Sequence, residues 1–256
     1  MPPVTTRSEP RQSRPQRVAE AIKQWVMDEG WQPGQRLPSE SELIARFGMA
    51  KGTIREAIRI LEAQGLVASR TGPGGGVFVH RVSEARAIAL LGNYFYFADL
   101  SLDDIYQLRS LLEPELAAGL AGRLSEAQLA RLEAAIAASA PPAVDPDDEA
   151  ARHAASLAFH AELAAMAGNP LLGFVIRFLA EMLGEVTVAR GLHSATDPAL
   201  WERGLACQTE LVAALRAGDA ERARAVLREH MATAHRMMRD REARPARRFL
   251  RDRVRG

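Results

Sequence analysis

The chain has little that would tie it to an oxidising compartment or to a membrane. Cys207 is the only cysteine among 256 residues, so an intramolecular disulfide is excluded and a reducing environment is favoured. No window contains about 18 uninterrupted apolar residues, as a membrane helix requires. The nearest, 87–100, is interrupted by Asn93 and predicts a buried or interface helix. The first residues are polar and rich in proline, unlike a signal sequence. We therefore expect a cytoplasmic protein with no membrane partner.

Motifs that carry common enzyme chemistry are also missing. The sequence has no Walker motif, no GxSxG nucleophile elbow and no Rossmann glycine fingerprint after a strand. His160-Ala161-Glu162 is similar to the His-x-Glu of zinc deaminases. Those enzymes also need a Pro-Cys-x-x-Cys segment, which a chain with one cysteine cannot supply. We expect no enzymatic activity.

Charge is distributed unevenly along a chain that is long enough for two domains. Residues 1–80 carry 11 basic and 8 acidic side chains, a net charge of +3. Residues 81–240 carry 15 and 22, a net charge of −7, and residues 241–256 carry 7 and 2, a net charge of +5. A basic module on an acidic body is typical of a protein that presents one end to nucleic acid. The basic tail is either a solvated, frayed helix end, which we favour, or a second DNA contact.

Residues 39–64 predict two short helices separated by a tight turn. Ser39 and Glu42 have the spacing of a capping box, and Gly48 stands where a left-handed residue ends a helix. A second helix is expected from about residue 50 to 64. Its apolar face consists of Ile54, Ala57, Ile58 and Leu61. These elements indicate a helix-turn-helix.

The second of these helices carries a cationic stripe on another face. Lys51, Arg55 and Arg59 follow one another at i, i+4 and i+8, a pattern that by itself is more often only a solvated surface. Residues 67–70 and 77–80 then predict two strands joined by a glycine-rich turn. Its glycines allow the backbone to approach a phosphate or a groove floor, and no Gly-Lys-Ser/Thr follows as in a P-loop. The hairpin favours a winged DNA-binding domain.

Four segments of this half occur in a fixed order: Pro33-Gly34, Leu37-Pro38-Ser39-Glu40, Thr53-Ile54-Arg55-Glu56 and Leu61-Glu62-Ala63-Gln64-Gly65-Leu66. With them, residues 14–80 resemble the winged helix-turn-helix of the GntR family of bacterial transcription regulators. The family's Val-Ser-Arg-like opening of the recognition helix is replaced by Met49-Ala50-Lys51. The usual serine N-cap is therefore missing, and a lysine replaces an arginine that can bind guanine bidentately. The expected DNA-binding residues are Arg36, Ser39, Lys51, Gly52, Thr53, Arg55, Arg59, Thr71 and Gly72.

Helix signals follow one another from residue 83 onward. The expected helices cover about 83–98, 102–123, 125–139 and 145–168, and three more begin after Asn169, Asp197 and Gly218-Asp219. The fold class is therefore mostly α. Residues 1–80 are expected to form a winged helix-turn-helix of three helices plus a β-hairpin wing, with a flexible arm over 1–13. Residues 81–240 are expected to form an all-α bundle of about seven helices for effector binding and dimerisation.

The helical half contains the segment 104–113 (DIYQLRSLLE), then Phe159-His160, 168–171, and 214–219 followed by His230. With these it resembles, more loosely, the FCD ligand-binding domain of the FadR subfamily. Many members hold a divalent metal with an aspartate and three histidines, and the matching positions here are Ser156, His160, Gln208 and His230. The carboxylate and one imidazole are lost, which leaves a poor divalent site. We expect no cofactor, and a weak divalent metal at His160 and His230 is disfavoured.

Arg109 and Glu113 lie one helical turn apart beside an apolar stripe. From the residues alone, the guanidinium is either paired with Glu113 or offered to an anionic ligand. The resemblance favours a small carboxylate effector, because Arg109 matches an arginine that such domains turn toward their cavity. The expected effector-binding residues are Arg109, Glu113, Ser156, His160, Asn169, Gln208 and His230.

These features favour a ligand-responsive, DNA-binding transcription regulator. One recognition helix reads only a few base pairs, so we expect a homodimer on a palindromic double-stranded DNA operator. The aromatic run 94–97 is a candidate dimer interface. In the family that the chain resembles, repression relieved by a ligand is the usual mode. The alternative is a helical small-molecule-binding or interaction protein without specific DNA binding, which leaves the cationic stripe and the glycine wing unexplained.

Overall fold

The computed structural model describes residues 12–98, 100–140, 146–189 and 198–254. The chain divides into two compact units, Met1–Ala89 and Leu90–Gly256. The division falls after Ala89, inside a helix, whereas the sequence placed the domain boundary at residue 80.

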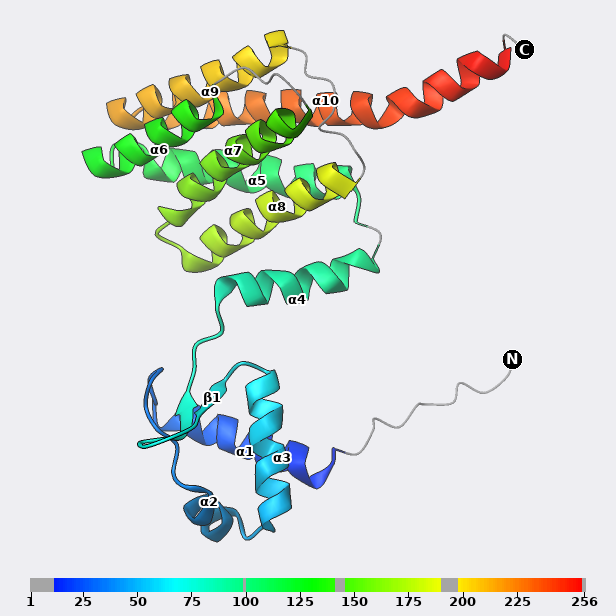
Figure 1. Cartoon of the computed structure of the whole chain (residues 1–256). Coiled ribbons are helices and arrows are strands. Elements are labelled where there is room, and N and C mark those ends of the chain that lie inside the picture. Colours follow the sequence, from blue (N-terminus) through cyan, green and yellow to red (C-terminus); the bar gives the residue numbers. More distant parts are fainter. Residues whose placement is uncertain (1–11, 99, 141–145, 190–197, 255–256) are drawn as a thin grey trace, which may run out of the picture. The chain divides into compact units, whose positions relative to one another are not determined.

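The first unit is a winged helix-turn-helix (Figure 1). Its elements are α1 (Arg14–Asp28), α2 (Glu40–Phe47), α3 (Lys51–Ala63) and the antiparallel strands β1 (Val67–Arg70) and β2 (Gly76–Val79). The strands pair from Val67 opposite Val79 to Arg70 opposite Gly76. The three helices and the hairpin expected from the sequence are therefore confirmed.

Local signals fix where the helices of this unit begin and end. The Ser39 hydroxyl accepts a hydrogen bond from the Glu42 amide, and the Glu42 carboxylate accepts one from the Ser39 amide at 2.7 Å, which is the expected capping box. Gly48 ends α2 at φ 62°, in the left-handed region that glycine adopts at little cost. The apolar faces meet in a core whose largest fully buried side chains are Ile22, Leu37, Leu43, Ile54 and Leu61. Burial of this face of α3 turns its cationic face outward.

The regular elements in the described part of the second unit are all helices, and the first of them begins in the first unit. They are α4 (Glu84–Tyr96), α5 (Leu102–Leu120), α6 (Glu126–Ser139), α7 (Pro146–Ala165), α8 (Pro170–Ala189), α9 (Pro198–Ala217) and α10 (Ala220–Val254). Helices α5 and α10 pack along each other, and α7 packs between α6 and α8 (Figure 1). The core is built around Leu132, Phe159, Leu163, Ile176, Leu211 and Met231. The mostly α fold is confirmed.

Helix ends in this unit also follow the sequence. Capping boxes at Ser101 and Ser125 begin α5 and α6. Gly122 follows the end of α5 at φ 70°, and a Cβ atom there would lie 3.2 Å from the Cα of Gly218. Glycine is therefore required where the ends of α5 and α9 meet.

The two ends of the chain and two of its helix starts differ from, or lie outside, what the structure allows to be compared with the sequence. Helix α10 continues through residue 240 to Val254, so the described part of the basic tail is helical. Ser13 caps α1 and so belongs to an ordered helix start rather than to the arm, whose residues 1–11 lie outside the described residues. Asp145 and Asp197, expected to cap α7 and α9, also lie outside them. Within the described ranges, no helix is both long and apolar enough to cross a bilayer.

Candidate DNA-binding surface and ligand cavity

The cationic stripe of α3 is displayed on the surface of the first unit. The side chains of Lys51 and Arg55 are 61% and 59% exposed, and Arg59 is also exposed. Thr53 is half-buried between them, and Gly52 is exposed. The opposite face of α3 is buried through Ile54, Ala57, Ile58 and Leu61. The helix therefore has the two faces that the sequence predicted.

Glu40 holds the start of this stripe in place. Its two carboxylate oxygens contact Lys51 Nζ at 3.3 Å and Arg55 Nε at 2.7 Å. The hydrogen bond from Arg55, supported by Lys51, lowers the pKa of the Glu40 carboxyl. Glu40 was not among the site residues expected from the sequence. It sits at the first position of α2, 15 residues from Arg55, where helical periodicity gives no sign of the contact.

A hollow of about 450 Å³ lies between α2, α3 and the wing. Four expected DNA-binding residues line it: Arg36, Ser39, Arg55 and Arg59. Arg36 is bridged to Phe78 of β2, and a Cβ atom at Gly76 would lie 2.6 Å from Arg36 Nε. Glycine at this position therefore lets the arginine lie against the wing. The Ser39 hydroxyl also donates to the Glu42 carboxylate at 2.6 Å, so its local partner is the helix cap.

The other expected residues of this surface lie outside the hollow. Lys51, Gly52 and Thr53 form the first turn of α3, whose N-cap Ala50 makes no side-chain cap hydrogen bond. Thr71 and Gly72 are exposed in the turn of the wing, where Gly72 has φ 92°. The helix start and the wing are thus both open to solvent, as a groove-binding surface requires.

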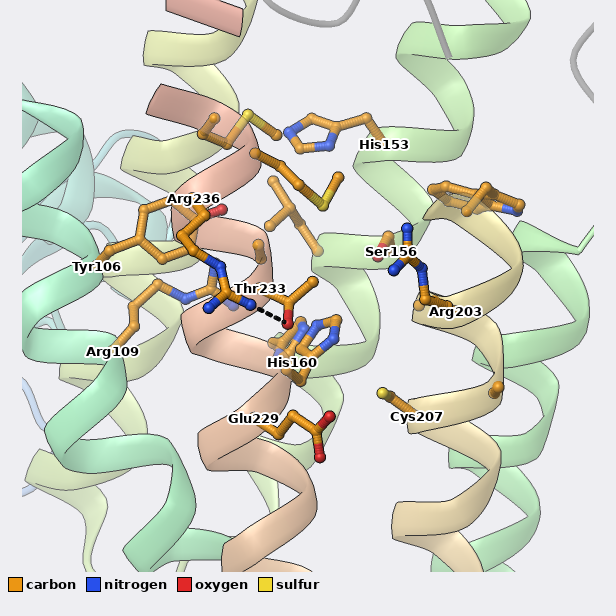
Figure 2. Close-up of a pocket in the computed structure, with 18 of the residues that line it drawn as sticks. Tyr106, Arg109, His153, Ser156, His160, Arg203, Cys207, Glu229, Thr233 and Arg236 are labelled. Carbon is orange, nitrogen blue, oxygen red and sulfur yellow. Dashed lines mark hydrogen bonds between the residues drawn. The ribbon is translucent and has the colours of Figure 1, made fainter. Parts of the chain in front are cut away.

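The second unit contains a cavity of about 400 Å³ between α5, α7, α9 and α10 (Figure 2). Four of the seven expected effector-binding residues line it: Arg109, Ser156, His160 and His230. Lining residues that the sequence analysis did not identify include Tyr106, Arg152, Trp201, Arg203, Thr233 and Arg236. They come from helices far apart in the chain, and local sequence patterns did not connect them.

Two lining residues of this cavity, Arg109 and His160, form a buried polar cluster with Glu113. Arg109 Nε donates to Glu113 Oε1 at 2.5 Å, and His160 Nδ1 donates to Glu113 Oε2 at 2.5 Å. Arg109 and His160 are 2% exposed, and Glu113 is fully buried. The ring of His230 stacks on that of His160 with centroids 5.3 Å apart. Arg109 is therefore paired with Glu113, which is the first of its two alternatives. The Nη2 atom of Arg109 nevertheless has no hydrogen-bond partner among the described residues.

Burial and charge set the ionisation of this group. Burial by itself raises the pKa of the Glu113 carboxyl, but the charge of Arg109 and then His160 hold it well below its usual range. Burial lowers the pKa of His230 to about 3, with further lowering from His160 and Arg109. Glu113 is thus an anion already matched by Arg109, and His230 is a neutral imidazole. The group can offer hydrogen bonds to a ligand without exposing an unmatched negative charge.

The donors at the family's metal positions do not fit a divalent ion. Ser156 supplies a hydroxyl, to which Gln208 Nε2 donates at 3.4 Å, and His160 uses Nδ1 for Glu113. Among the described residues, no three His, Cys, Asp or Glu side chains converge as a metal site would require. Divalent metals prefer carboxylate and imidazole ligands, so a hydroxyl–amide pair is a weak substitute.

Three expected effector-binding residues do not line the cavity. Glu113 lies beneath it as the partner of Arg109 and His160. Gln208 is buried behind Ser156. Asn169 is exposed, and its side-chain oxygen accepts hydrogen bonds from the amides of Leu171 and Leu172 at the start of α8. Its position in the structure is that of a helix cap, away from the ligand cavity.

Two parts of the chain match known families. Residues 15–79 match the bacterial regulatory proteins of the gntR family, and residues 104–233, about half of the chain, match the FCD domain. The HTH-type transcriptional regulator RmpR of Mycobacterium gastri is 30% identical over 230 residues, which cover 88% of this chain and 80% of RmpR. The HTH-type transcriptional repressor NanR of Escherichia coli (strain K12 / DH10B) is 28% identical over 223 residues, which cover 84% and 80%.

Structural similarity agrees with these matches. The solved structure of GntR from Streptococcus agalactiae has a TM-score of 0.61 and 21% sequence identity to this chain, and the match covers 87% of this chain and 99% of that one. This similarity supports the fold, and the sequence matches supply the function. The chain is a DNA-binding transcription regulator that belongs to the GntR family and carries a C-terminal FCD domain, and it is not an enzyme.

Proposed function

We propose that this regulator is a repressor that binds a palindromic operator as a homodimer and is released by a small organic acid. The observation that carries the proposal is the cavity of the FCD domain, in which one guanidinium nitrogen of the buried Arg109 has no hydrogen-bond partner among the residues that the structure describes. A guanidinium is the preferred protein donor to a carboxylate. No metal is needed in this arrangement.

On the DNA side, the start of α3 enters the major groove. Lys51, Gly52, Thr53 and Arg55 contact base edges, and Arg36, Arg59 and the wing turn at 71–72 approach phosphates or the minor groove. Glu40 orients Lys51 and Arg55 before DNA arrives, because one carboxylate contacts both cations. An arginine held in this way loses less side-chain entropy when it binds guanine.

On the effector side, a carboxylate accepts from Arg109 Nη2. His160, His230 and Ser156 line the same space and supply further hydrogen bonds to hydroxyl or carboxyl oxygens of the ligand. Glu113 keeps Arg109 in position, and Gln208 supports Ser156 from behind. Because its target is chromosomal DNA in a bacterium, we place the protein in the cytoplasm.

Exposed apolar side chains of the second unit support a homodimer. Seven of them are on or next to α4 and α5: Leu90, Leu91, Tyr94, Tyr96, Phe97, Leu108 and Leu111. Large exposed apolar side chains are typical of a protein–protein interface. The aromatic run 94–97, expected from the sequence to contribute, supplies Tyr94, Tyr96 and Phe97.

DNA binding by the stripe of α3 is tested with the variant Arg55→Ala. We expect loss of about 1–3 kcal/mol of binding free energy to promoter DNA, measured by fluorescence anisotropy with a fragment of the protein's own promoter. Affinity of the unchanged protein should fall steeply with rising salt, because phosphate contacts release counterions. Arg131→Ala, on α6 of the other unit, is the matched control and should bind DNA as the unchanged protein does. Salt-independent binding, or an Arg55→Ala variant that binds normally, would contradict this surface.

A further inference from the structure

Buried polar atoms without a hydrogen-bond partner gather around one cavity. In the described part of the chain, four such side-chain atoms are Arg109 Nη2, Arg152 Nε, Trp201 Nε1 and Gln208 Oε1. Arg109, Arg152 and Trp201 line the cavity of the FCD domain, and Gln208 donates from behind to a fourth lining residue, Ser156. Gln208 Oε1 is an acceptor, and the other three atoms are donors. Unbonded buried donors are destabilising, so these three indicate a ligand that accepts from them.

The three lining donors lie at two ends of the cavity. Arg109 shares one end with His160. Arg152 and Trp201 form the other, where the guanidinium carbon lies 4.2 Å from the centroid of the indole ring. Arg152 and His160 are eight residues apart on α7, or about 12 Å along the helix axis. Figure 2 shows the same direction, from His153 near the top of the view past Ser156 to His160.

The other lining residues and their charges indicate which kind of ligand the cavity would bind. Leu157, Gly204 and Ala234 belong to the lining and offer no side-chain hydrogen bonds, and Ser156 stands midway between Arg152 and His160 on α7. Five arginines line the cavity against two glutamates, and one of these, Glu210, is paired with Arg222. Glu113 matches the charge of Arg109, and the rest of the lining still has more cationic than anionic side chains, which suits an anionic ligand.

We propose that the effector is an elongated dianion with an apolar body. One carboxylate accepts from Arg109 at the His160 end, and a second anionic group accepts from Arg152 Nε and Trp201 Nε1 at the other. This inference rests on the proposed carboxylate site and specifies its ligand. A short diacid reaches one end only. A fatty acid of matching length places a methyl group against the donors of Arg152 and Trp201 and leaves them unbonded.

The test is calorimetric titration of the full-length protein with suberate, octanoate and succinate. Suberate should bind about tenfold more tightly than either of the others, as expected for one further charge-assisted hydrogen-bonding end. Trp201→Phe keeps an aromatic ring and removes one donor, so it should weaken suberate about tenfold and leave octanoate unchanged. Arg152→Met should act in the same way. Trp31→Phe, in the first unit, is the matched control and should change neither affinity.

Two sets of results separate this inference from the proposed function. If octanoate or succinate binds as tightly as suberate, or if Trp201→Phe weakens all three equally, the second anionic end is overturned and the anchor at Arg109 stands. Arg109→Lys keeps a positive charge beside Glu113 and removes the free guanidinium nitrogen. If that variant binds suberate and succinate as the unchanged protein does, or if none of the three acids binds, both the anchor and the elongated ligand are overturned.

Discussion

At the scale of single residues, the contacts of Glu113 explain how a charged group is kept inside the FCD domain. Its two oxygens each accept one hydrogen bond, from Arg109 and from His160. Each carboxylate oxygen thus has one donor, and the charge is matched by a guanidinium. A buried ion pair of this kind adds little net stability, but removing one partner leaves the other charge uncompensated.

Glu113→Ala is therefore expected to lower the free energy of unfolding of the FCD domain by about 3–5 kcal/mol. The measurement is urea unfolding followed by circular dichroism. Glu162→Ala removes a carboxylate from the surface pair with Arg131 in the same domain and should cost at most about 1 kcal/mol. Equal effects of the two variants would show that the buried group is not needed for folding.

His230 makes the stability of the same domain depend on pH. Its pKa in the folded protein is about 3, below the ordinary value of about 6.5, so the unfolded chain binds a proton first as the pH falls. The stabilising effect is complete above about pH 6.5 and is lost progressively toward pH 3. Between pH 7 and pH 5 the loss should be on the order of 1–2 kcal/mol. Urea unfolding of His230→Gln should show a weaker dependence in this range, and an unchanged dependence would contradict the assignment.

At the scale of elements, α2 and α3 differ in how they begin. Helix α2 has a complete capping box at Ser39 and Glu42, whereas α3 begins after Ala50, which has no side chain to accept from its first amides. The helix that we propose reads DNA is thus the less well capped of the two. Its position depends on burial of Ile54 and Leu61 and on the contacts of Glu40 with its first turn.

Ala50→Ser should stabilise the first unit by about 1 kcal/mol, because a serine at the N-cap accepts a hydrogen bond from the free amides of the first turn. Ser39→Ala should destabilise it by about the same amount. Thermal unfolding of both variants checks the pair. Ala63→Ser, at the last residue of α3, is the control and should give no gain. A lower stability for Ala50→Ser would mean that the helix start is held by tertiary contacts alone.

At the scale of the whole molecule, the chain has two separate hydrophobic cores. One is built on residues such as Ile22 and Leu37 and the other on residues such as Leu132 and Phe159. Separate cores unfold as separate cooperative units unless a tight interface couples them. This separation also lets a ligand stabilise the FCD domain without filling the DNA-binding core.

Scanning calorimetry of the full-length protein should therefore resolve two transitions. Leu37→Ala should lower the midpoint of one transition and Leu132→Ala that of the other. Each substitution leaves a cavity in its own core and should lower the free energy of unfolding by about 2–5 kcal/mol. A bound acid should raise only the transition that Leu132→Ala lowers. A single transition shifted by both variants would show that the two cores unfold together.

The sequence by itself determined the elements and the family. Helix starts are marked by capping residues such as Ser39 and Ser125, and helix ends by residues such as Gly48. These signals act over three or four positions, so the helices and the wing could be predicted from local patterns. The motif around Thr53-Ile54-Arg55-Glu56 was enough to indicate the family, which the matches confirmed.

Only the tertiary structure decided how the charged side chains are used. Glu40 meets Arg55 across 15 residues, and Glu113 meets His160 across 47. Trp201 reaches Arg152 from another helix, and Asn169, expected in the cavity, caps α8 outside it. Helical periodicity tells which face a residue occupies but not which distant helix packs against that face. The physical reason is that hydrogen bonds and ion pairs depend on distances of a few ångströms, which packing fixes only after the chain has folded.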